Sequence, residues 1–434
     1  MPLFRQMVIP HSQDRPLSIT PAREATGRIT AIDGMRAMAM LMVYLYHTWE
    51  FGGSPQLRLE FGGSPELRHT GISFGAIING FPAGVDLFMV LSGFCLFWPL
   101  VSKPGLLNNW KTGDFAVRRI RRIFPPYLAS MVIVSLLPNT LVCIFKLAHL
   151  QAKWQQFPSL WQYATHLTFT HTLFPGTWDG IQGAYWSLAL EAQLYVVFPL
   201  VIWGFRRMGM NVLLPMVLMS LVYRGIGAVI LKDAGWTVNF LYSVTFLGRW
   251  MEFAAGMLAA WIVVRRRNSP LSAFQGTMLC IAAALNYSVA VSHLFPEFDL
   301  FSLREVLLSL SFGSLAVAMC ASRTSLRAVL ENRVMVFLGL ISYSIFLLHQ
   351  NTMYYFGEML KKVLHFGDLT RFEILITIGF ALTISFSYAF YRVFEHPFVS
   401  SGPKPVVQKR DQPIVTSDNT QDMSHGLQRR DAVA

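Results

Sequence analysis

Arg36 and His47 stand in one otherwise apolar segment, and their types and spacing suggest chemistry. They are eleven residues apart. On an α-helix that separation is about three turns and roughly 16 Å of rise, so both side chains are predicted to share a face. An imidazole can take a proton from a hydroxyl group, and a guanidinium can hold a phosphate or stabilise an oxyanion. The pair predicts acid–base chemistry within an apolar environment.

Both residues also have a structural explanation. Asp33 precedes Arg36 by three residues, so the two could form an ion pair on one helical face. Arg36 could instead extend to the lipid headgroups, and a histidine near a membrane interface is often only hydrogen-bonded. The coincidence of Arg36 and His47 on one face favours a functional reading.

A second cluster of cations lies in the stretch FAVRRIRRIFPPYL. Arg118, Arg121 and Arg122 fall at i, i+3 and i+4, on one predicted helical face. Guanidinium groups in that arrangement suit phosphates, which makes the three residues a candidate phosphate clamp. The alternative is a run of basic residues that only fixes the orientation of the next membrane span.

Three further ionisable residues lie inside apolar stretches, where such groups are costly and are functional candidates. Asp86 follows Gly84-Val85, Glu191 lies in YWSLALEAQLYVVFPL, and His349 ends the run ISYSIFLLH. A carboxylate at such a depth must pair, bind an ion or stay protonated. None of the four cysteines has the spacing of a metal site, so no metal is predicted.

The elements that must position these residues are membrane-spanning helices. Of the 434 residues, 53% are hydrophobic and 14% are charged, compared with about 25% charged in an ordinary soluble domain. The sequence therefore predicts an all-α integral membrane protein, a bundle of about ten transmembrane helices. The expected spans lie near 31–49, 81–101, 124–145, 184–203, 211–231, 239–263, 272–292, 303–320, 334–355 and 372–394.

The distribution of lysine and arginine predicts the orientation of the bundle. With ten spans and both termini cytoplasmic, the inner segments carry 23 of these residues and the outer segments carry 8. This asymmetry follows the positive-inside rule. Topology and anionic membrane lipid account for most of the net charge of +12, so no nucleic-acid partner is expected.

Three regions are expected along the chain: a cytoplasmic N-terminal segment (1–30), a membrane domain (31–398) and a disordered cytoplasmic tail (399–434). The first 28 residues lack the apolar core of a signal peptide. Glu50–Leu59 and Glu60–His69 are identical at 8 of 10 positions. Their glycines and prolines predict a lengthened outer loop directly after His47.

Several motifs together resemble the membrane-bound acyltransferase 3 family. DGMR, ten residues and His47 are similar to the first-span pattern of that family. The segments GVDLFMVLSGF, RRIRRIFPPY, WSLALEAQLYVVFPL, LGLISYSIFLLH and FEHPF follow in the same order as the family's later motifs. The match runs from about residue 29 to residue 398, with Leu194 and Phe346 at positions where the family commonly has Phe and Tyr.

The resemblance implies transfer of an acyl group, often acetyl, from cytoplasmic acyl-CoA to a hydroxyl of a carbohydrate, a glycolipid or a secondary metabolite. It implies catalytic roles for His47, Arg36 and Glu191, donor binding by the arginine cluster, and less directly roles for Asp33, Asp86 and His349. Two other classes fit the composition, a transporter or exporter that uses the buried polar residues, and a membrane scaffold without catalysis. Release of free CoA from acetyl-CoA would distinguish an acyltransferase from a transporter, and a scaffold would keep its function with alanine at Arg36, His47 and Glu191.

Overall fold

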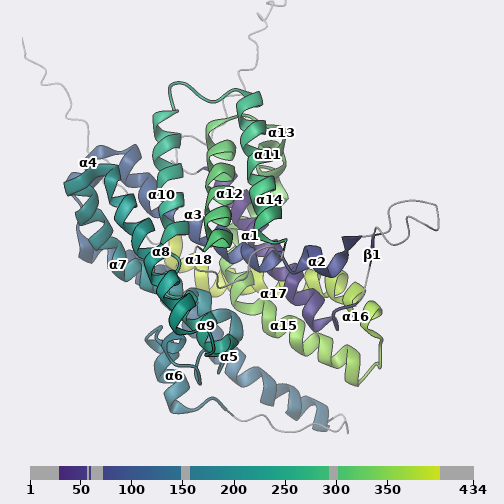
Figure 1. Cartoon of the computed structure of the whole chain (residues 1–434). Coiled ribbons are helices and arrows are strands. Elements are labelled where there is room, and N and C mark those ends of the chain that lie inside the picture. Colours follow the sequence, from purple (N-terminus) through teal and green to yellow (C-terminus); the bar gives the residue numbers. More distant parts are fainter. Residues whose placement is uncertain (1–28, 56–57, 60–71, 148–156, 293–301, 401–434) are drawn as a thin grey trace, which may run out of the picture.

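The computed structural model describes residues 29–55, 58–59, 72–147, 157–292 and 302–400 of the chain (Figure 1). Outside these residues lie nearly all of the expected tail (399–434), nearly all of the N-terminal segment (1–30) and the second copy of the repeat. The described chain is helical apart from two antiparallel two-residue strands, β1 (Arg58–Leu59) and β2 (Ile72–Ser73). The all-helical class predicted from the sequence is confirmed.

The α-helices, in chain order, are α1 (Thr30–Phe51), α2 (Phe74–Ile78), α3 (Gly84–Ser102), α4 (Pro104–Asn108), α5 (Thr112–Leu147), α6 (Leu160–Leu167), α7 (Trp186–Met208), α8 (Leu213–Ile230), α9 (Trp236–Ser243), α10 (Trp250–Arg265), α11 (Ala273–Ala290), α12 (Leu303–Ala321), α13 (Ser325–Leu330), α14 (Arg333–Leu340), α15 (Ser342–Lys362), α16 (Asp368–Ile374), α17 (Phe380–Phe390) and α18 (His396–Ser400). Short 3-10 turns join several of them, among them η3 (Phe81–Ala83), η4 (His171–Leu173), η5 (Gly183–Tyr185) and η6 (Gly209–Val212). Two five-residue π-helical segments, η7 (Leu375–Gly379) and η8 (Tyr391–Glu395), continue the last long helix.

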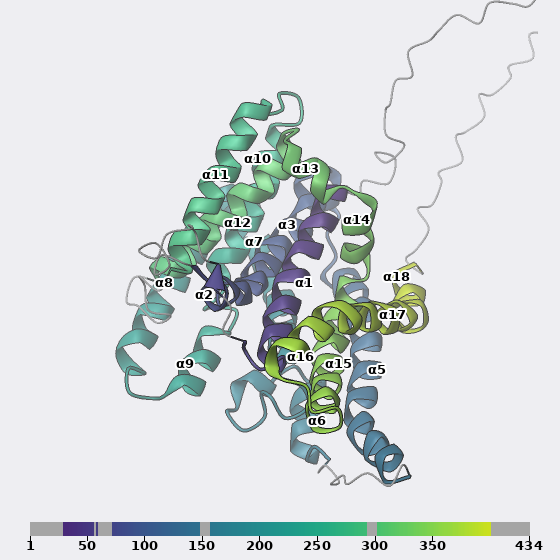
Figure 2. The same ribbon diagram turned by 90° about the vertical axis from the view of Figure 1, so that its right-hand side faces the viewer.

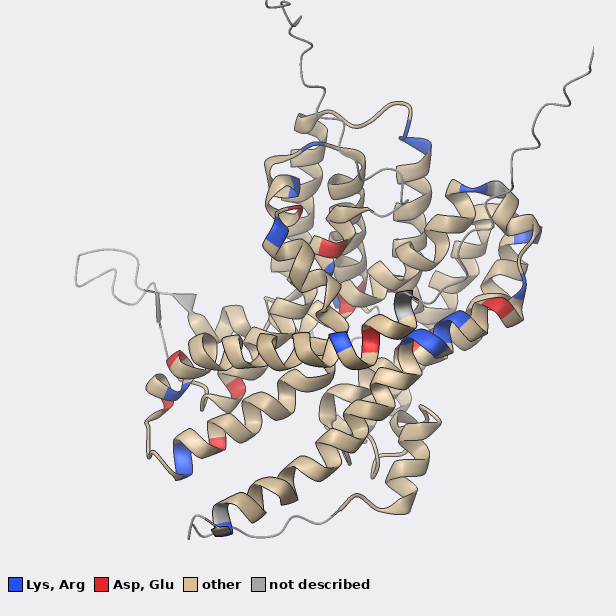
Figure 3. Ribbon diagram, turned by 180° about the vertical axis from the view of Figure 1, so that it is seen from behind, with Lys and Arg blue, Asp and Glu red and all other residues tan. Residues whose placement is uncertain are grey.

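Six helices of the described chain are long and apolar enough to cross a membrane, or seven if one bent pair counts as a single span. The longest of these stretches, Gly183–Ile230, contains both α7 and α8, which are separated at Gly209. Tan, the colour of uncharged residues, covers most of the ribbon in Figure 3, as expected for helices that face lipid or one another. The chain is therefore a multi-pass membrane protein, whereas ten spans and cytoplasmic termini stay predictions.

Two of the expected spans are broken in the structure. The segment 239–263 is divided between α9 and α10, and the segment 334–355 between α14 and α15. The axes of α14 and α15 differ by 75°. Ser342, the first residue of the 21-residue helix α15, is buried, so this helix begins inside the protein.

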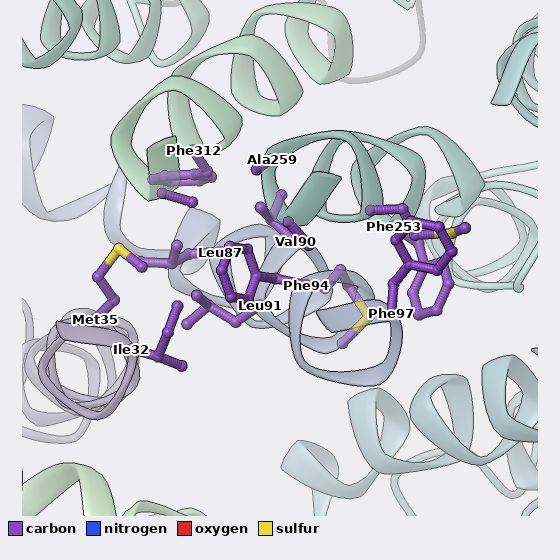
Figure 4. Close-up of a cluster of buried hydrophobic side chains, with 14 of the residues drawn as sticks. Ile32, Met35, Leu87, Val90, Leu91, Phe94, Phe97, Phe253, Ala259 and Phe312 are labelled. Carbon is purple, nitrogen blue, oxygen red and sulfur yellow. The ribbon is translucent and has the colours of Figure 1, made fainter. Parts of the chain in front are cut away.

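Helix α1 joins two hydrophobic cores. One core packs α1 against α3, α10 and α12, and the other packs it against α14, α15 and α17. In Figure 2, α1 runs through the middle of the molecule, with α10–α12 on one side and α14–α18 on the other. Figure 4 shows the first core, where Met35 of α1 lies near Leu87 and Leu91 of α3. The helix that carries Arg36 and His47 is thus enclosed for most of its length.

The crossing of α3 and α10 depends on glycine. A Cβ atom added at Gly256 would lie 1.9 Å from the Val90 carbonyl oxygen, and one at Gly93 would lie 2.1 Å from the Phe253 carbonyl oxygen. Only hydrogen atoms fit between the two backbones at these points. Small residues at such crossings let helix backbones approach closely within a membrane.

The prediction that the repeat forms only a loop is wrong for its first residues. Helix α1 continues to Phe51, so Glu50 and Phe51 of the first copy are helical. The helix ends there because Gly53, with φ +96°, and Ser54, with φ 53°, adopt left-handed conformations. The helix therefore continues for one residue beyond Glu50. Glu50 lies three positions, about one helical turn, after His47.

Candidate active site

Five helices enclose a pocket in the middle of the bundle. Its lining combines apolar side chains with polar groups, listed here by helix: Arg36 of α1, Ser92 and Cys95 of α3, Arg119 and Arg122 of α5, Ser187, Glu191 and Tyr195 of α7, and Ser342, Tyr343 and Phe346 of α15. The structure thus brings together Arg36 of the first predicted span, Arg122 just before the third and Glu191 of the fourth. The remaining predicted residues lie elsewhere.

The pocket is electropositive. None of Arg36, Arg119 and Arg122 forms a salt bridge within the described part of the chain, although each lines the pocket. The Arg119 guanidinium carbon lies 5.4 Å from the ring centroids of both Phe115 and Tyr195. Its buried Nε atom has no hydrogen-bond partner among the described residues. Arginines held in this way are available to an anionic ligand.

Glu191 supplies the negative charge of the pocket. The Tyr195 hydroxyl, one turn further along α7, donates a hydrogen bond of 2.5 Å to Glu191 Oε1. This bond fixes the direction of the carboxylate, because both groups project from the same helical face. Near the same arginines, Glu395 accepts a 2.5 Å hydrogen bond from the Ser344 hydroxyl. Two carboxylates therefore partly balance the three arginines.

The N-terminus of α15 also meets the pocket, since Ser342 and Tyr343 line it. The backbone N–H groups of a helix's first turn have no partner within the helix, and the helix dipole favours negative charge there. The 75° bend that places this N-terminus in the bundle thereby adds to the positive potential of the arginines.

His47 lies outside this pocket, at the far end of α1, and faces a second histidine. The ring centroids of His47 and His349 are 5.3 Å apart with an interplanar angle of 44°. His349 is buried, and its Nδ1 atom lies 2.8 Å from the Phe346 carbonyl oxygen. Its Nε2 atom is buried without a hydrogen-bond partner among the described residues. Two imidazoles thus share one small region.

Phe346 connects the pocket with the histidine pair. It lines the pocket, and its ring centroid is 5.8 Å from that of His349, one helical turn away on α15. Arg36 and His47 both face α15, one at the pocket and one at His349, so the prediction of a shared helical face agrees with their surroundings. One helix therefore links a cationic pocket to an imidazole pair.

The arginines in the pocket differ from those predicted by spacing. Arg119 and Arg122 line the pocket, whereas Arg118 and Arg121 are exposed. Sequence reasoning missed Arg119 because RRIRR places a cation on nearly every face of the helix. The i, i+3 spacing of Arg119 and Arg122 was a signal of equal weight.

Asp33 and Asp86 lie away from the pocket. Asp33 is buried on α1, one turn before Arg36. Asp86 forms a buried salt bridge with Arg249, which lies 3.2 Å from Glu252. Asp86 therefore belongs to a buried charge cluster between α3 and α10, in which Arg249 pairs with both Asp86 and Glu252. Within the described residues, no group of three histidines, cysteines or carboxylates could hold a metal ion.

Comparison with known proteins identifies relatives across most of the chain. Residues 29–392 match the family described as "Acyltransferase domain". The chain is 23% identical over 418 residues to the "Regulator of hypoxia-inducible factor 1" of Caenorhabditis elegans, a match that covers 86% of this chain and 80% of that protein. No solved structure matches it.

Two bacterial relatives have names that include an activity. The chain is 22% identical to "Putative O-acetyltransferase SACOL0978" of Staphylococcus aureus, covering 87% of this chain and 58% of that protein. It is 27% identical to "Putative peptidoglycan O-acetyltransferase YrhL" of Bacillus subtilis, covering 74% of this chain and 48% of that protein. The chain thus spans about half the length of these two relatives.

The family match covers well over half of the chain, and the apolar helices and the pocket between them belong to the matched region. The chain therefore belongs to the acyltransferase family and is a membrane-embedded member of it.

Proposed function

We propose that this membrane acyltransferase moves an acyl group, acetyl in the simplest case, from acyl-CoA to a hydroxyl group of an acceptor. The observation that carries the proposal is that the two ends of α1 lie in two different environments. Arg36 lines a cationic pocket at one end, and His47 meets His349 at the other end. A donor with phosphates suits the first environment, and a reacting hydroxyl suits the second.

The donor end is supported by charge. Arg36, Arg119 and Arg122 together with the N-terminus of α15 form an environment for an anionic group. Acyl-CoA is anionic and is made in the cytoplasm, the side to which the positive-inside rule assigns this arginine-rich segment. The exposed Arg118 and Arg121 could add long-range attraction at the pocket entrance.

The reacting end is supported by the chemistry of imidazole. A hydroxyl is a poor nucleophile until a base takes its proton, and histidine is suited to this at neutral pH. In the proposed step, His47 accepts the hydroxyl proton while the hydroxyl oxygen forms a bond to the thioester carbonyl carbon. The carbon–sulfur bond then breaks, and the CoA thiolate takes the proton back from His47. The alternative step is one in which His47 carries the acyl group transiently.

Roles for the other candidates follow from their positions. In the proposed reaction Arg36 holds the pantetheine end of the donor, because it lines the pocket about three helical turns away from His47. Glu191 is proposed to orient the arginines, a role supported by the presence of its carboxylate in the same pocket. His349 offers a lone pair beside His47, which suits a contact to the acceptor hydroxyl.

A carbohydrate is the proposed class of acceptor. The name of the Bacillus subtilis relative mentions peptidoglycan, a polymer with sugar hydroxyls. The acceptor would approach the end of α1 that carries His47, and membrane lipid surrounds the bundle.

The experiment is an assay of the purified protein in detergent or nanodiscs with acetyl-CoA and a sugar acceptor, measuring free CoA thiol. We expect His47→Ala to lower turnover by about 10²- to 10⁴-fold, the usual contribution of a general base. His365→Ala is the matched control, because His365 is an exposed histidine outside the pocket and the histidine pair. Normal turnover by a folded His47→Ala protein would refute the assignment, and no CoA release by the wild type would favour a transporter.

A further inference from the structure

The last turn of α1 places a carboxylate beside His47. Glu50 Oε2 lies 3.1 Å from His47 Nδ1, and the two residues are three positions apart on the helix. The His47 ring also stacks on Phe51, with centroids 5.8 Å apart and planes inclined by 15°. These two contacts hold the ring at one edge and on one face.

The hydrogen bond determines which nitrogen of His47 holds the proton. An ionised carboxylate can only accept, so Nδ1 must carry the hydrogen and Nε2 must carry the lone pair of the neutral ring. Glu50 is the hydrogen-bond partner of this ring in the part of the chain that the structure describes. A base that acts through Nε2 needs this tautomer.

His349 does not fix the tautomer of His47. Carbonyl oxygens only accept, so the contact of its Nδ1 with the Phe346 carbonyl assigns a hydrogen to Nδ1 and a lone pair to Nε2. His349 Nε2 therefore has no proton to donate to His47 when the ring is neutral. The tautomer of His47 depends on Glu50 rather than on the second imidazole.

The backbone after Glu50 is held by α16. Arg371 Nη2 donates a 3.2 Å hydrogen bond to the Gly52 carbonyl oxygen and forms a 2.7 Å salt bridge with Asp368. A Cβ atom at Gly53, where φ is +96°, would lie 2.2 Å from the same Arg371 nitrogen. The buried arginine thus caps the end of α1, two residues beyond Glu50. The position of the carboxylate does not rest on a free loop.

We propose that Glu50 is a positioning residue, which holds His47 with Nε2 directed to the acceptor and stabilises the imidazolium formed during transfer. The proposal rests on the proposed function of His47. Glu50 remains ionised throughout, and the hydroxyl proton moves only to His47 Nε2 and then to the CoA thiolate. Glu50 belongs to the first copy of the duplicated decapeptide, so that copy contributes to the site and not only to a loop.

The test is a set of variants at Glu50, assayed for CoA release. In Glu50→Gln the charge is lost, and the amide can either accept or donate, so the tautomer is no longer fixed. We expect turnover to fall about 10-fold, a typical effect for a group that orients another, with KM for acetyl-CoA unchanged. The acid limb of the pH–rate profile should move to lower pH, and Glu50→Asp should recover part of the rate.

Glu373→Gln is the matched control, because Glu373 is an exposed carboxylate on α16, close to the same end of α1. We expect it to behave as the wild type. Glu50 is about half exposed, so Glu50→Gln should keep the wild-type unfolding temperature.

The failure of this proposal can be told apart from failure of the proposed function. An inactive His47→Ala together with a Glu50→Gln protein of wild-type turnover and pH profile would overturn the role of Glu50 alone. A loss of turnover in Glu50→Gln accompanied by a lower unfolding temperature and no recovery in Glu50→Asp would also overturn it, in favour of a structural role. An active His47→Ala would overturn both.

Discussion

At the scale of single residues, Arg119 and Arg122 line the pocket, while Arg118 and Arg121 are exposed on the same helix. The four arginines thereby allow two different sets to be compared within one short segment. The spacing in the sequence favours Arg118, Arg121 and Arg122, whereas the pocket favours Arg119 and Arg122. The affinity of alanine variants for the acyl-CoA donor would show which set binds it.

We expect Arg119→Ala and Arg122→Ala each to raise KM for acetyl-CoA by about 10-fold or more. A hydrogen bond to a charged group contributes about 1.5–3 kcal/mol, and the pocket arginines have no salt bridge among the described residues that would reduce their availability. Arg118→Ala and Arg121→Ala should have smaller effects that weaken at high salt. Steady-state kinetics of CoA release measures both. Larger increases in KM for Arg118→Ala and Arg121→Ala than for the two pocket variants would instead assign donor binding to the exposed pair.

The sequence predicts residue types better than it predicts partners. Arg36, Glu191 and His47 stand out because a charge or an imidazole in an apolar run is unusual. Asp86 stands out for the same reason, yet its partner is Arg249, about 160 positions later, in a different helix. Glu50 does not stand out, because the expected span ends at residue 49 and the glycines and proline of the repeat predict a loop from Glu50 on. Only the packing of helices that lie far apart along the chain shows which of these residues share a site and which form a separate ion pair.

At the scale of elements, the segment between α5 and α7 holds a pair of buried histidines. The rings of His166 on α6 and His171 on η4 are stacked, with centroids 3.9 Å apart and planes inclined by 2°. Burial lowers the pKa of His166 to about 4, and burial together with His166 lowers the pKa of His171 to about 3. Asp179 opposes the shift of His166. Both rings are therefore neutral in the folded protein at neutral pH.

This pair predicts a loss of stability in acid. A histidine whose folded pKa is lowered contributes stability that is complete above its unfolded pKa of about 6.5 and is lost as the pH falls toward 4. We expect the unfolding temperature of the wild type to fall between pH 7.5 and pH 5, and to fall less in His171→Phe, which keeps a ring but cannot titrate. His365→Phe, at an exposed site, is the control. Equal decreases in the wild type and His171→Phe would contradict the expectation.

The bend between α14 and α15 is a feature that a hydrophobicity pattern does not predict. The run from Val334 to Tyr355 contains no proline, and its apolar pattern predicts one continuous span. The structure instead turns by 75° between Leu340 and Ser342. Packing against α1 accompanies this turn, because α14 and α15 contribute to the core that includes Tyr44 and Met40. Such packing has no local signature, whereas the continuous α1 was predictable from its own residues.

At the scale of the whole molecule, the charge asymmetry predicts an orientation that can be measured. We expect alkaline phosphatase fused after residue 398 to be inactive and green fluorescent protein fused there to be fluorescent, because cytoplasmic segments collect lysine and arginine. Fusions within the predicted outer segment near Lys232 should give the opposite result. An active phosphatase at residue 398 would contradict an even number of spans with a cytoplasmic N-terminus.

Phe346 has a consequence for the membrane as an electrical barrier. Its ring lies against both the arginine pocket and His349, so an apolar group stands between the two polar regions. A continuous chain of water molecules through the protein would conduct protons and discharge the gradient across the membrane. An aromatic ring at this point would interrupt such a chain, and its rotation would let the acyl end of a donor reach the imidazoles. The enzyme would then pass chemical groups from one side toward the other without acting as an ion leak.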